Sequence, residues 1–239
     1  MRLFPFEGEL MRTVLRTVTA LTIVAATTLI AGPAHAVAWS SADRWGTWSS
    51  SGYTLYNNVW GSRYGPQTIW ANSASNWGVW ANHPDTGGIK SYPNATRYLG
   101  KQVSALGTTT SSFNVTVPTS GVAFTTAYDI WSSDNAHEIM LWMNKYGAVG
   151  PLGTLQTTTS VGGHTWAIYR GSNGANQVYS FVRTSNTNSG TVDIRAVVQW
   201  IRSQGWFGDV TIGNIQLGYE ITSSAGGKDF VTNSFTVTG

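Results

Sequence analysis

The sequence of 239 residues contains 12 Trp, 10 Tyr and 8 Phe, whereas only 10% of its residues are charged. With 41% hydrophobic residues the chain can bury a sizeable core, which excludes an intrinsically disordered protein. The absence of Cys excludes disulfides, thiolate metal sites and Cys nucleophiles, and a net charge of +3 without runs of Lys or Arg argues against a nucleic-acid-binding surface.

Residues 1–36 have the features of a secretory signal peptide. Two arginines precede an apolar stretch over residues 18–31, and Ala34-His35-Ala36 matches the A-x-A cleavage signature. The alternative is a membrane anchor, but about 14 residues fall short of the roughly 20 needed to span a bilayer. We therefore expect an exported protein whose mature chain begins at Val37. Met11 directly precedes this signal and is a candidate start, in place of Met1.

From residue 37 onwards the sequence predicts one domain, 37–239, because it contains no long linker, internal repeat or block of like charge. Short runs rich in Val, Ile, Thr, Tyr and Trp recur between clusters of Gly, Asn, Ser and Pro, a pattern typical of strands. Examples of predicted strands are residues 53–60, 113–117, 122–131, 138–143, 165–169, 177–183, 211–221 and 229–237. Eight or more strands indicate an all-β sandwich or barrel.

One segment predicts a helix packed on the outside of this sandwich. Apolar side chains recur there at i, i+3, i+4 and i+7: Ile194, Val197, Val198 and Ile201. Asp193 is placed to cap the first turn and Gly205 to end the helix. We expect no other helix in the domain.

Side-chain alternation along the strand at residues 138–142 predicts an unusual surface. Glu138, Met140 and Trp142 point to one face, while Ile139 and Leu141 point to the other and belong to the core. A carboxylate, a thioether and an indole on one face suit the floor of a sugar-binding site, where a sugar ring stacks on an aromatic side chain.

Three other predicted strands offer comparable faces. The same alternation places Glu220 with Gln216, Asn58 with Trp60, and Asp129 with Trp131. If these faces line one concave sheet, they form an open groove for a polysaccharide.

After residue 36 the chain contains only two glutamates, Glu138 and Glu220, and both lie in the middle of predicted strands. Carboxylates are rare in the middle of strands, because their strand propensity is low and burying a charge costs free energy. Two of them at such positions therefore suggest a function. Two carboxylates in a sugar groove are the groups that glycoside hydrolysis needs. The alternatives are core packing for the aromatic residues and solvated surface for each Glu taken alone.

Other chemistries lack the residues they need. The histidines of the domain, His83, His137 and His164, are isolated in the sequence and show no metal-ligand spacing. No G-x-S-x-G, P-loop or G-x-G-x-x-G motif is present. We therefore expect no metal and no cofactor.

Several sequence blocks, in order, resemble those of glycoside hydrolase family 12. They are Asn57-Asn58-Val59-Trp60-Gly61, Gly88-Ile89-Lys90-Ser91-Tyr92-Pro93-Asn94, Ala127-Tyr128-Asp129-Ile130-Trp131, Glu138-Ile139-Met140-Leu141-Trp142, Gly150-Pro151-Leu152-Gly153, Gln177-Val178-Tyr179-Ser180-Phe181 and Gly218-Tyr219-Glu220. The resemblance spans nearly the whole mature chain. It implies a β-jelly-roll sandwich of two antiparallel sheets with a concave cleft, and a retaining endo-β-1,4-glucanase.

By this resemblance Glu138 matches the nucleophile, Glu220 the acid/base and Asp129 a third carboxylate beside the nucleophile. The positions that match substrate-binding residues are Trp45 at an outer subsite, and Asn58, Trp60, Met140, Trp142 and Pro151 in the groove. The chain departs from the family in lacking disulfides, in a segment Ile130–His137 that looks shorter than in many relatives, and in Tyr219, which stands where Thr is common.

We therefore expect a secreted, monomeric endo-β-1,4-glucanase that acts on soluble or amorphous cellulose or β-glucan, without nucleic-acid or membrane partners. The alternatives are specificity for xyloglucan or mixed-linkage glucan, a xylanase of the related jelly-roll family, and a non-catalytic carbohydrate-binding sandwich. Glu220 needs a raised pKa to act as an acid. Because its strand neighbours Leu217, Tyr219 and Ile221 face the opposite way, we expect the charge of Glu138 to be the larger cause.

Overall fold

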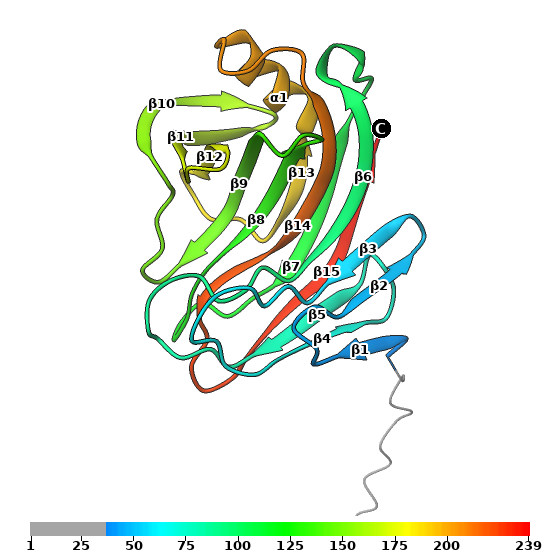
Figure 1. Cartoon of the computed structure of the whole chain (residues 1–239), viewed down its shortest axis with the longest axis vertical. Helices are drawn as coiled ribbons and strands as arrows, with labels where there is room; N and C mark the ends of the chain where they lie inside the picture. The colour runs from blue at the N-terminus through cyan, green and yellow to red at the C-terminus, as the bar shows by residue number, and fades with distance from the viewer. Residues whose placement is uncertain (1–36) are drawn as a thin grey trace, which may run out of the picture. The chain divides into compact units, whose positions relative to one another are not determined.

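A computed structural model describes residues 37–239, and the predicted signal peptide lies outside the described residues. Within them the chain forms fifteen strands, one α-helix and one 3-10 turn (Figure 1). No helix among these residues is long and apolar enough to cross a membrane. The elements are β1 Trp39–Ser41, β2 Thr47–Ser50, β3 Tyr53–Tyr56, β4 Gln67–Ala71, β5 Trp77–Ala81, β6 Asn94–Gln102, η1 Val103–Ala105, β7 Thr110–Thr116, β8 Ala123–Ser132, β9 His137–Tyr146, β10 Thr154–Val161, β11 His164–Ser172, β12 Gln177–Arg183, β13 Ser189–Asp193, α1 Ile194–Ser203, β14 Thr211–Ser223 and β15 Lys228–Thr238.

The strands form two sheets that pack face to face. One has six strands in the order β1-β4-β5-β15-β7-β13, and the other has nine in the order β10-β11-β12-β9-β8-β14-β6-β3-β2. Strands distant in the sequence are neighbours in both sheets, as in a jelly roll. The pairs are antiparallel as predicted, except that β12 runs parallel to β9.

Alternation decides which side chains fill the core. Ile139 and Leu141 of β9 are fully buried in the main hydrophobic cluster, which takes residues from both sheets. Met140 and Trp142 belong to a separate cluster on the opposite face of the nine-stranded sheet. The predicted division of this strand into two faces is therefore confirmed. Tyr219 packs in the core against Trp77, with ring centroids 5.6 Å apart.

The predicted strands are all present, but the first is shorter than predicted. The strand expected over residues 53–60 ends at Tyr56, because Asn58 has a left-handed φ of 45° that a strand cannot contain. Asparagine is one of the few residues that adopt this conformation readily. The strands named from the sequence did not include β1, β2, β4, β5, β6, β10 and β13. Five of these, β1, β2, β4, β5 and β13, have at most five residues, and β10 is rich in Thr.

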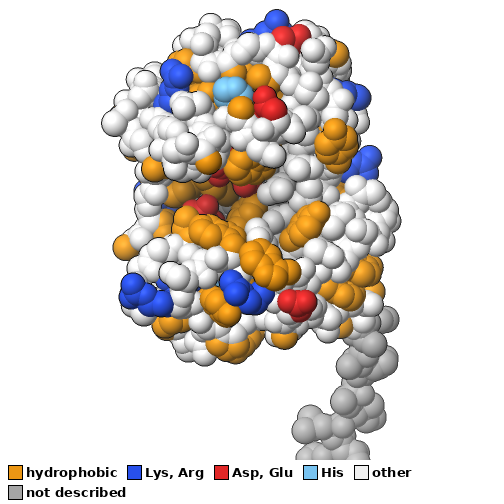
Figure 2. Space-filling model, in the orientation of Figure 1, with side chains coloured by type: hydrophobic (Ala, Val, Ile, Leu, Met, Phe, Trp, Pro, Cys, Tyr) orange, Lys and Arg blue, Asp and Glu red, His pale blue; other side chains and the backbone are white. Residues whose placement is uncertain are grey.

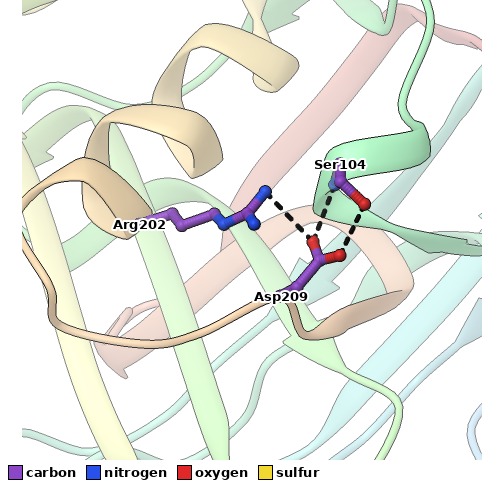
Figure 3. A network of polar contacts seen from close by, with 3 residues as sticks. All are labelled: Ser104, Arg202 and Asp209. Carbon is purple, nitrogen blue, oxygen red and sulfur yellow. Dashed lines mark hydrogen bonds and ion pairs between the residues drawn. The ribbon is translucent and has the colours of Figure 1, made fainter.

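The helix forms as its sequence pattern predicts. The Asp193 side chain accepts a hydrogen bond from the Ala196 N–H, and the four apolar positions of α1 are buried. Near its end Arg202 lies 3.3 Å from Asp209, which also accepts hydrogen bonds from the backbone N–H and the hydroxyl of Ser104 (Figure 3). These contacts attach the end of α1 to the turn η1 that follows β6.

Candidate active site

A cleft of about 680 Å³ opens on the concave face of the nine-stranded sheet. Figure 2 shows a hollow in which acidic and hydrophobic side chains lie together. Its lining residues are Asn58, Trp60, Ile89, Tyr92, Asp129, Trp131, Glu138, Met140, Trp142, Gly150, Pro151, Leu152, Asn173, Val178, Gln216 and Glu220. The cleft thus brings together all the site residues predicted from the sequence except Trp45.

The floor of the cleft is built from three adjacent strands, β9, β8 and β14. In their register Glu138 pairs with Trp131, and Asp129 pairs with both Met140 and Gln216. Side chains of paired residues point to the same face of a sheet. This register places Glu138 and Asp129 diagonally across neighbouring strands.

The wall beside Glu220 is formed by a segment from the β5–β6 connection. Ser91 forms a bridge with Ile221, and the Tyr219 N–H donates to the Pro93 carbonyl at 3.1 Å. The segment therefore runs alongside the strand that carries Glu220, and its Tyr92 side chain enters the cleft. The Tyr92 hydroxyl donates to the Ala127 carbonyl at 3.1 Å.

Asn58 and Trp60 both line the cleft, but they lie in an irregular segment. The prediction grouped them by alternation along a strand, and no strand is present at these residues. The side chain of Asn58 donates to the Tyr92 carbonyl at 3.1 Å, which links this segment to the wall beside Glu220. The Trp60 ring is 48% exposed and is therefore accessible to a sugar.

Trp45 does not line the cleft. It lies in the turn between β1 and β2 and is 58% exposed. The Val59 N–H donates to the Arg44 carbonyl at 3.0 Å, so this turn borders the segment that carries Asn58. The role of Trp45 as an outer subsite stays a prediction.

Asn176 holds the Glu138 carboxylate, and the sequence patterns did not identify it. Its Nδ2 donates to Glu138 Oε2 at 2.8 Å, while its Oδ1 accepts from Asn173 Nδ2 at 2.8 Å. Burial raises the pKa of Glu138, and the hydrogen bond from Asn176 lowers it. Asn176 lies in a turn rich in Gly, Ser and Asn, and no spacing in the sequence relates such a turn to a distant Glu.

Asp129 is suited to be a neutral neighbour of Glu138. Burial is the main cause that raises its pKa well above the usual range, and the charge of Glu138 adds to it. The Trp131 indole N–H donates to Asp129 Oδ2 at 2.9 Å, whereas Oδ1 is buried without a partner among the described residues.

Burial is the larger cause that raises the pKa of Glu220 to about 7, and the charge of Glu138 is the smaller one. The prediction that the charge would dominate is wrong. Leu217, Tyr219 and Ile221 face the core, as predicted. Residues of other segments can nevertheless bury the Glu220 side chain. The segment that carries Tyr92 runs beside this strand, and Tyr92 lines the cleft together with Glu220.

We expect Asn176→Ala to lower activity most strongly at acid pH. Without its hydrogen bond the pKa of Glu138 rises, so the carboxylate protonates at higher pH and the acid limb of the kcat/KM profile moves upward. A hydrogen bond to a charged group contributes about 1.5–3 kcal/mol, which predicts a loss of roughly tenfold or more on that limb. Asn186→Ala, which removes an exposed amide bonded to the backbone of Lys145, is the control. If the acid limb of the Asn176→Ala profile lies at the same pH as in wild type, Asn176 does not lower the pKa of Glu138.

Comparison with known proteins identifies the same family that the sequence motifs resemble. Residues 51–238 match the model of glycosyl hydrolase family 12. The chain belongs to this family.

Among family 12 relatives, the xyloglucan-specific endo-beta-1,4-glucanase A of Emericella nidulans is 31% identical over 195 residues, which cover 74% of this chain and 82% of that protein. The xyloglucanase domain of NopAA, a type three effector from Sinorhizobium fredii solved in complex with cellobiose, is 45% identical with a TM-score of 0.82. The match covers 85% of this chain and 99% of that one. The family 12 xyloglucanase from Bacillus licheniformis is 27% identical with a TM-score of 0.75, over 84% and 99% of the two chains.

Family 12 membership makes the protein a glycoside hydrolase with a β-jelly-roll domain. The described residues contain no group of three or more His, Asp or Glu side chains that could hold a metal ion. The titratable groups gathered in the cleft are Asp129, Glu138, Glu220 and Tyr92.

Proposed function

We propose that the protein is an endo-β-1,4-glucanase that hydrolyses internal bonds of soluble or amorphous β-glucan with retention of configuration. The observation that carries this proposal is the asymmetry between the two glutamates. Burial raises the pKa of Glu138, but the hydrogen bond from Asn176 opposes this rise and favours the ionised form. Glu220 has no such hydrogen bond among the causes of its shift, and burial and the charge of Glu138 raise its pKa to about 7. Two carboxyl groups with different protonation states suit the roles of nucleophile and acid.

In this mechanism Glu138 attacks the anomeric carbon while Glu220 protonates the departing glycosidic oxygen. The C–O bond breaks, and a covalent glycosyl-enzyme ester forms on Glu138. Glu220, now ionised, takes a proton from a water molecule that displaces the ester and releases Glu138. Asp129, whose pKa burial raises, is kept neutral and so adds no second negative charge beside Glu138. The indoles of Trp60 and Trp142 offer faces on which sugar rings can stack.

Xyloglucan is the second candidate substrate, because the relatives from Emericella nidulans, Sinorhizobium fredii and Bacillus licheniformis are named for it. A branched glucan needs a cleft open to solvent on its long side. The large exposed fraction of Trp60 at the rim is compatible with that requirement.

Activity on a panel of carboxymethylcellulose, barley β-glucan, xyloglucan and xylan tests these assignments. We expect reducing sugar from at least one of the three glucans and none from xylan. Binding to these polymers without release of reducing sugar would instead support a non-catalytic carbohydrate-binding sandwich. The polymer with the highest kcat/KM identifies the preferred substrate.

We also propose that residues 1–36 are removed on export and that residues 37–239 form a monomeric catalytic domain. The A-x-A site and the compact fold that follows it support this proposal. N-terminal sequencing of secreted protein should return Val37, and size-exclusion chromatography should give the mass of one chain. A sequence that begins upstream of Ile30 would contradict the cleavage site.

A further inference from the structure

Gln67 lies at the centre of a buried hydrogen-bond network behind the cleft wall. It belongs to β4 of the six-stranded sheet and is only 4% exposed. Its Oε1 accepts from His83 Nε2 at 2.8 Å and from the Ser91 hydroxyl at 2.7 Å. Its Nε2 donates to the carbonyl of Asn57 at 2.7 Å and to Asn57 Oδ1 at 2.8 Å. All four hydrogen-bonding positions of this amide are therefore used.

Backbone groups at the ends of the network fix the direction of the bonds that Gln67 makes with His83 and Asn57. The Gly65 N–H can only donate, and it donates to His83 Nδ1 at 3.0 Å. His83 Nε2 must then carry the proton and donate to Gln67. At the other end Asn57 Nδ2 donates to the Asp43 carbonyl at 2.7 Å, and a carbonyl can only accept. A chain with fixed ends has one arrangement of donors and acceptors, so it holds its members in one geometry.

The network joins the separate segments that make one wall of the cleft. Asn57 directly precedes Asn58, and Ser91 directly precedes Tyr92. Asn58 and Tyr92 both line the cleft. The Asp43 carbonyl belongs to the turn that carries Trp45. The segment with Ser91 is bridged to Ile221 of β14. The segment with Asn57 and the turn with Trp45 belong to no strand, so sheet hydrogen bonds do not fix their positions.

Asn58 depends on this support more than an ordinary loop residue does. Its left-handed φ of 45° is sparsely populated and persists only where the surroundings enforce it. Gln67 fixes the carbonyl and the side chain of the residue directly before it. The Asn58 side chain then reaches the Tyr92 carbonyl, so the two segments are fixed relative to each other.

We propose that Gln67 is a positioning residue that holds Asn58 and Trp60 in their substrate-binding arrangement. This inference rests on the proposed glucanase function. Gln67 and His83 do not line the cleft, so they act only through the residues that they hold. Glu138 and Glu220 lie on β9 and β14, whose geometry the sheet fixes without this network. Disturbing it should therefore weaken the binding of sugar more than it slows the chemical step.

The test is Gln67→Met, which conserves volume and removes the four hydrogen bonds, assayed on cellopentaose or the best polymer of the panel. We expect KM to rise roughly tenfold or more while kcat stays within about threefold of wild type, because contacts shared by ground and transition states act on KM. General destabilisation does the opposite, since it lowers the active fraction and hence kcat while KM stays the same. Thr232→Val, which removes a buried hydrogen bond to Tyr219 in the core, is the matched control and should leave KM unchanged.

A second variant keeps the test decisive if Gln67→Met does not fold. Asn57→Ala removes the acceptor of Gln67 Nε2 and the donor to the Asp43 carbonyl, while the backbone bond stays. It should also raise KM with little change in kcat. A folded variant with KM within about twofold of wild type, or with only kcat reduced, would overturn the inference. Wild type without activity on any glucan would instead contradict the proposed function.

Discussion

Glu138→Gln is expected to reduce kcat by roughly 10³-fold or more while the protein stays folded and still binds oligosaccharide. An amide cannot attack the anomeric carbon, so the covalent intermediate does not form. The loss corresponds to about 4 kcal/mol or more of transition-state stabilisation. The Gln side chain retains an oxygen that can accept from Asn176 Nδ2, so the geometry of the site is kept. Steady-state kinetics and calorimetric titration with cellotetraose measure the two effects separately.

Asp229→Asn is the matched control for this experiment. It makes the same carboxylate-to-amide change at an exposed position of β15, outside the cleft. We expect its kcat to equal that of wild type. Activity of Glu138→Gln within about tenfold of wild type, a difference of only about 1.4 kcal/mol, would remove Glu138 from the role of nucleophile.

Glu220→Ala should slow deglycosylation strongly while leaving glycosylation of the enzyme by an activated substrate nearly intact. An aryl β-cellobioside with a good leaving group needs little protonation, so the first step proceeds without Glu220. The second step lacks its general base, and the glycosyl-enzyme accumulates. Azide needs no base, and its attack on the intermediate should restore turnover and form a β-glycosyl azide.

The configuration of the azide product decides the stereochemical assignment. Two inversions at the anomeric carbon give retention, and the β product follows from azide attack on an α-linked intermediate. Formation of an α-glycosyl azide would sink the retaining mechanism, and so would the absence of rescue alongside an inverted product from wild type. Intact-mass measurement of the trapped variant should show one cellobiosyl group on Glu138.

We also expect the pKa of Glu220 to set the alkaline limit of activity in the wild-type enzyme. Burial and the charge of Glu138 raise this pKa to about 7, and only the protonated form can act as the acid. We expect kcat/KM to decrease about tenfold per pH unit above about pH 7 on a substrate with a poor leaving group. On the activated aryl cellobioside, which needs little protonation, this alkaline decrease should be much smaller.

Local sequence patterns were sufficient to predict the strands of the cleft floor and the face on which each side chain lies. Period-two alternation depends only on the local backbone, so the separation of Glu138 and Met140 from Ile139 could be read without knowledge of the neighbouring strands. The helix was equally local, because its cap at Asp193 and its apolar stripe lie within a few turns of chain. The shared motifs identified the family, which the comparison confirmed.

The groups that surround these side chains could not be predicted from local sequence and depend on how distant segments pack together. Asn176 reaches Glu138 from a turn 38 residues away, and Gln67 holds Asn57 from the opposite sheet. Burial raises the pKa of Glu220 although Leu217, Tyr219 and Ile221 of its own strand face the core. Desolvation and hydrogen bonding depend on every atom within a few ångströms, and most of those atoms belong to residues far away in the sequence. Alternation along one strand does not predict which of these distant residues lie nearby.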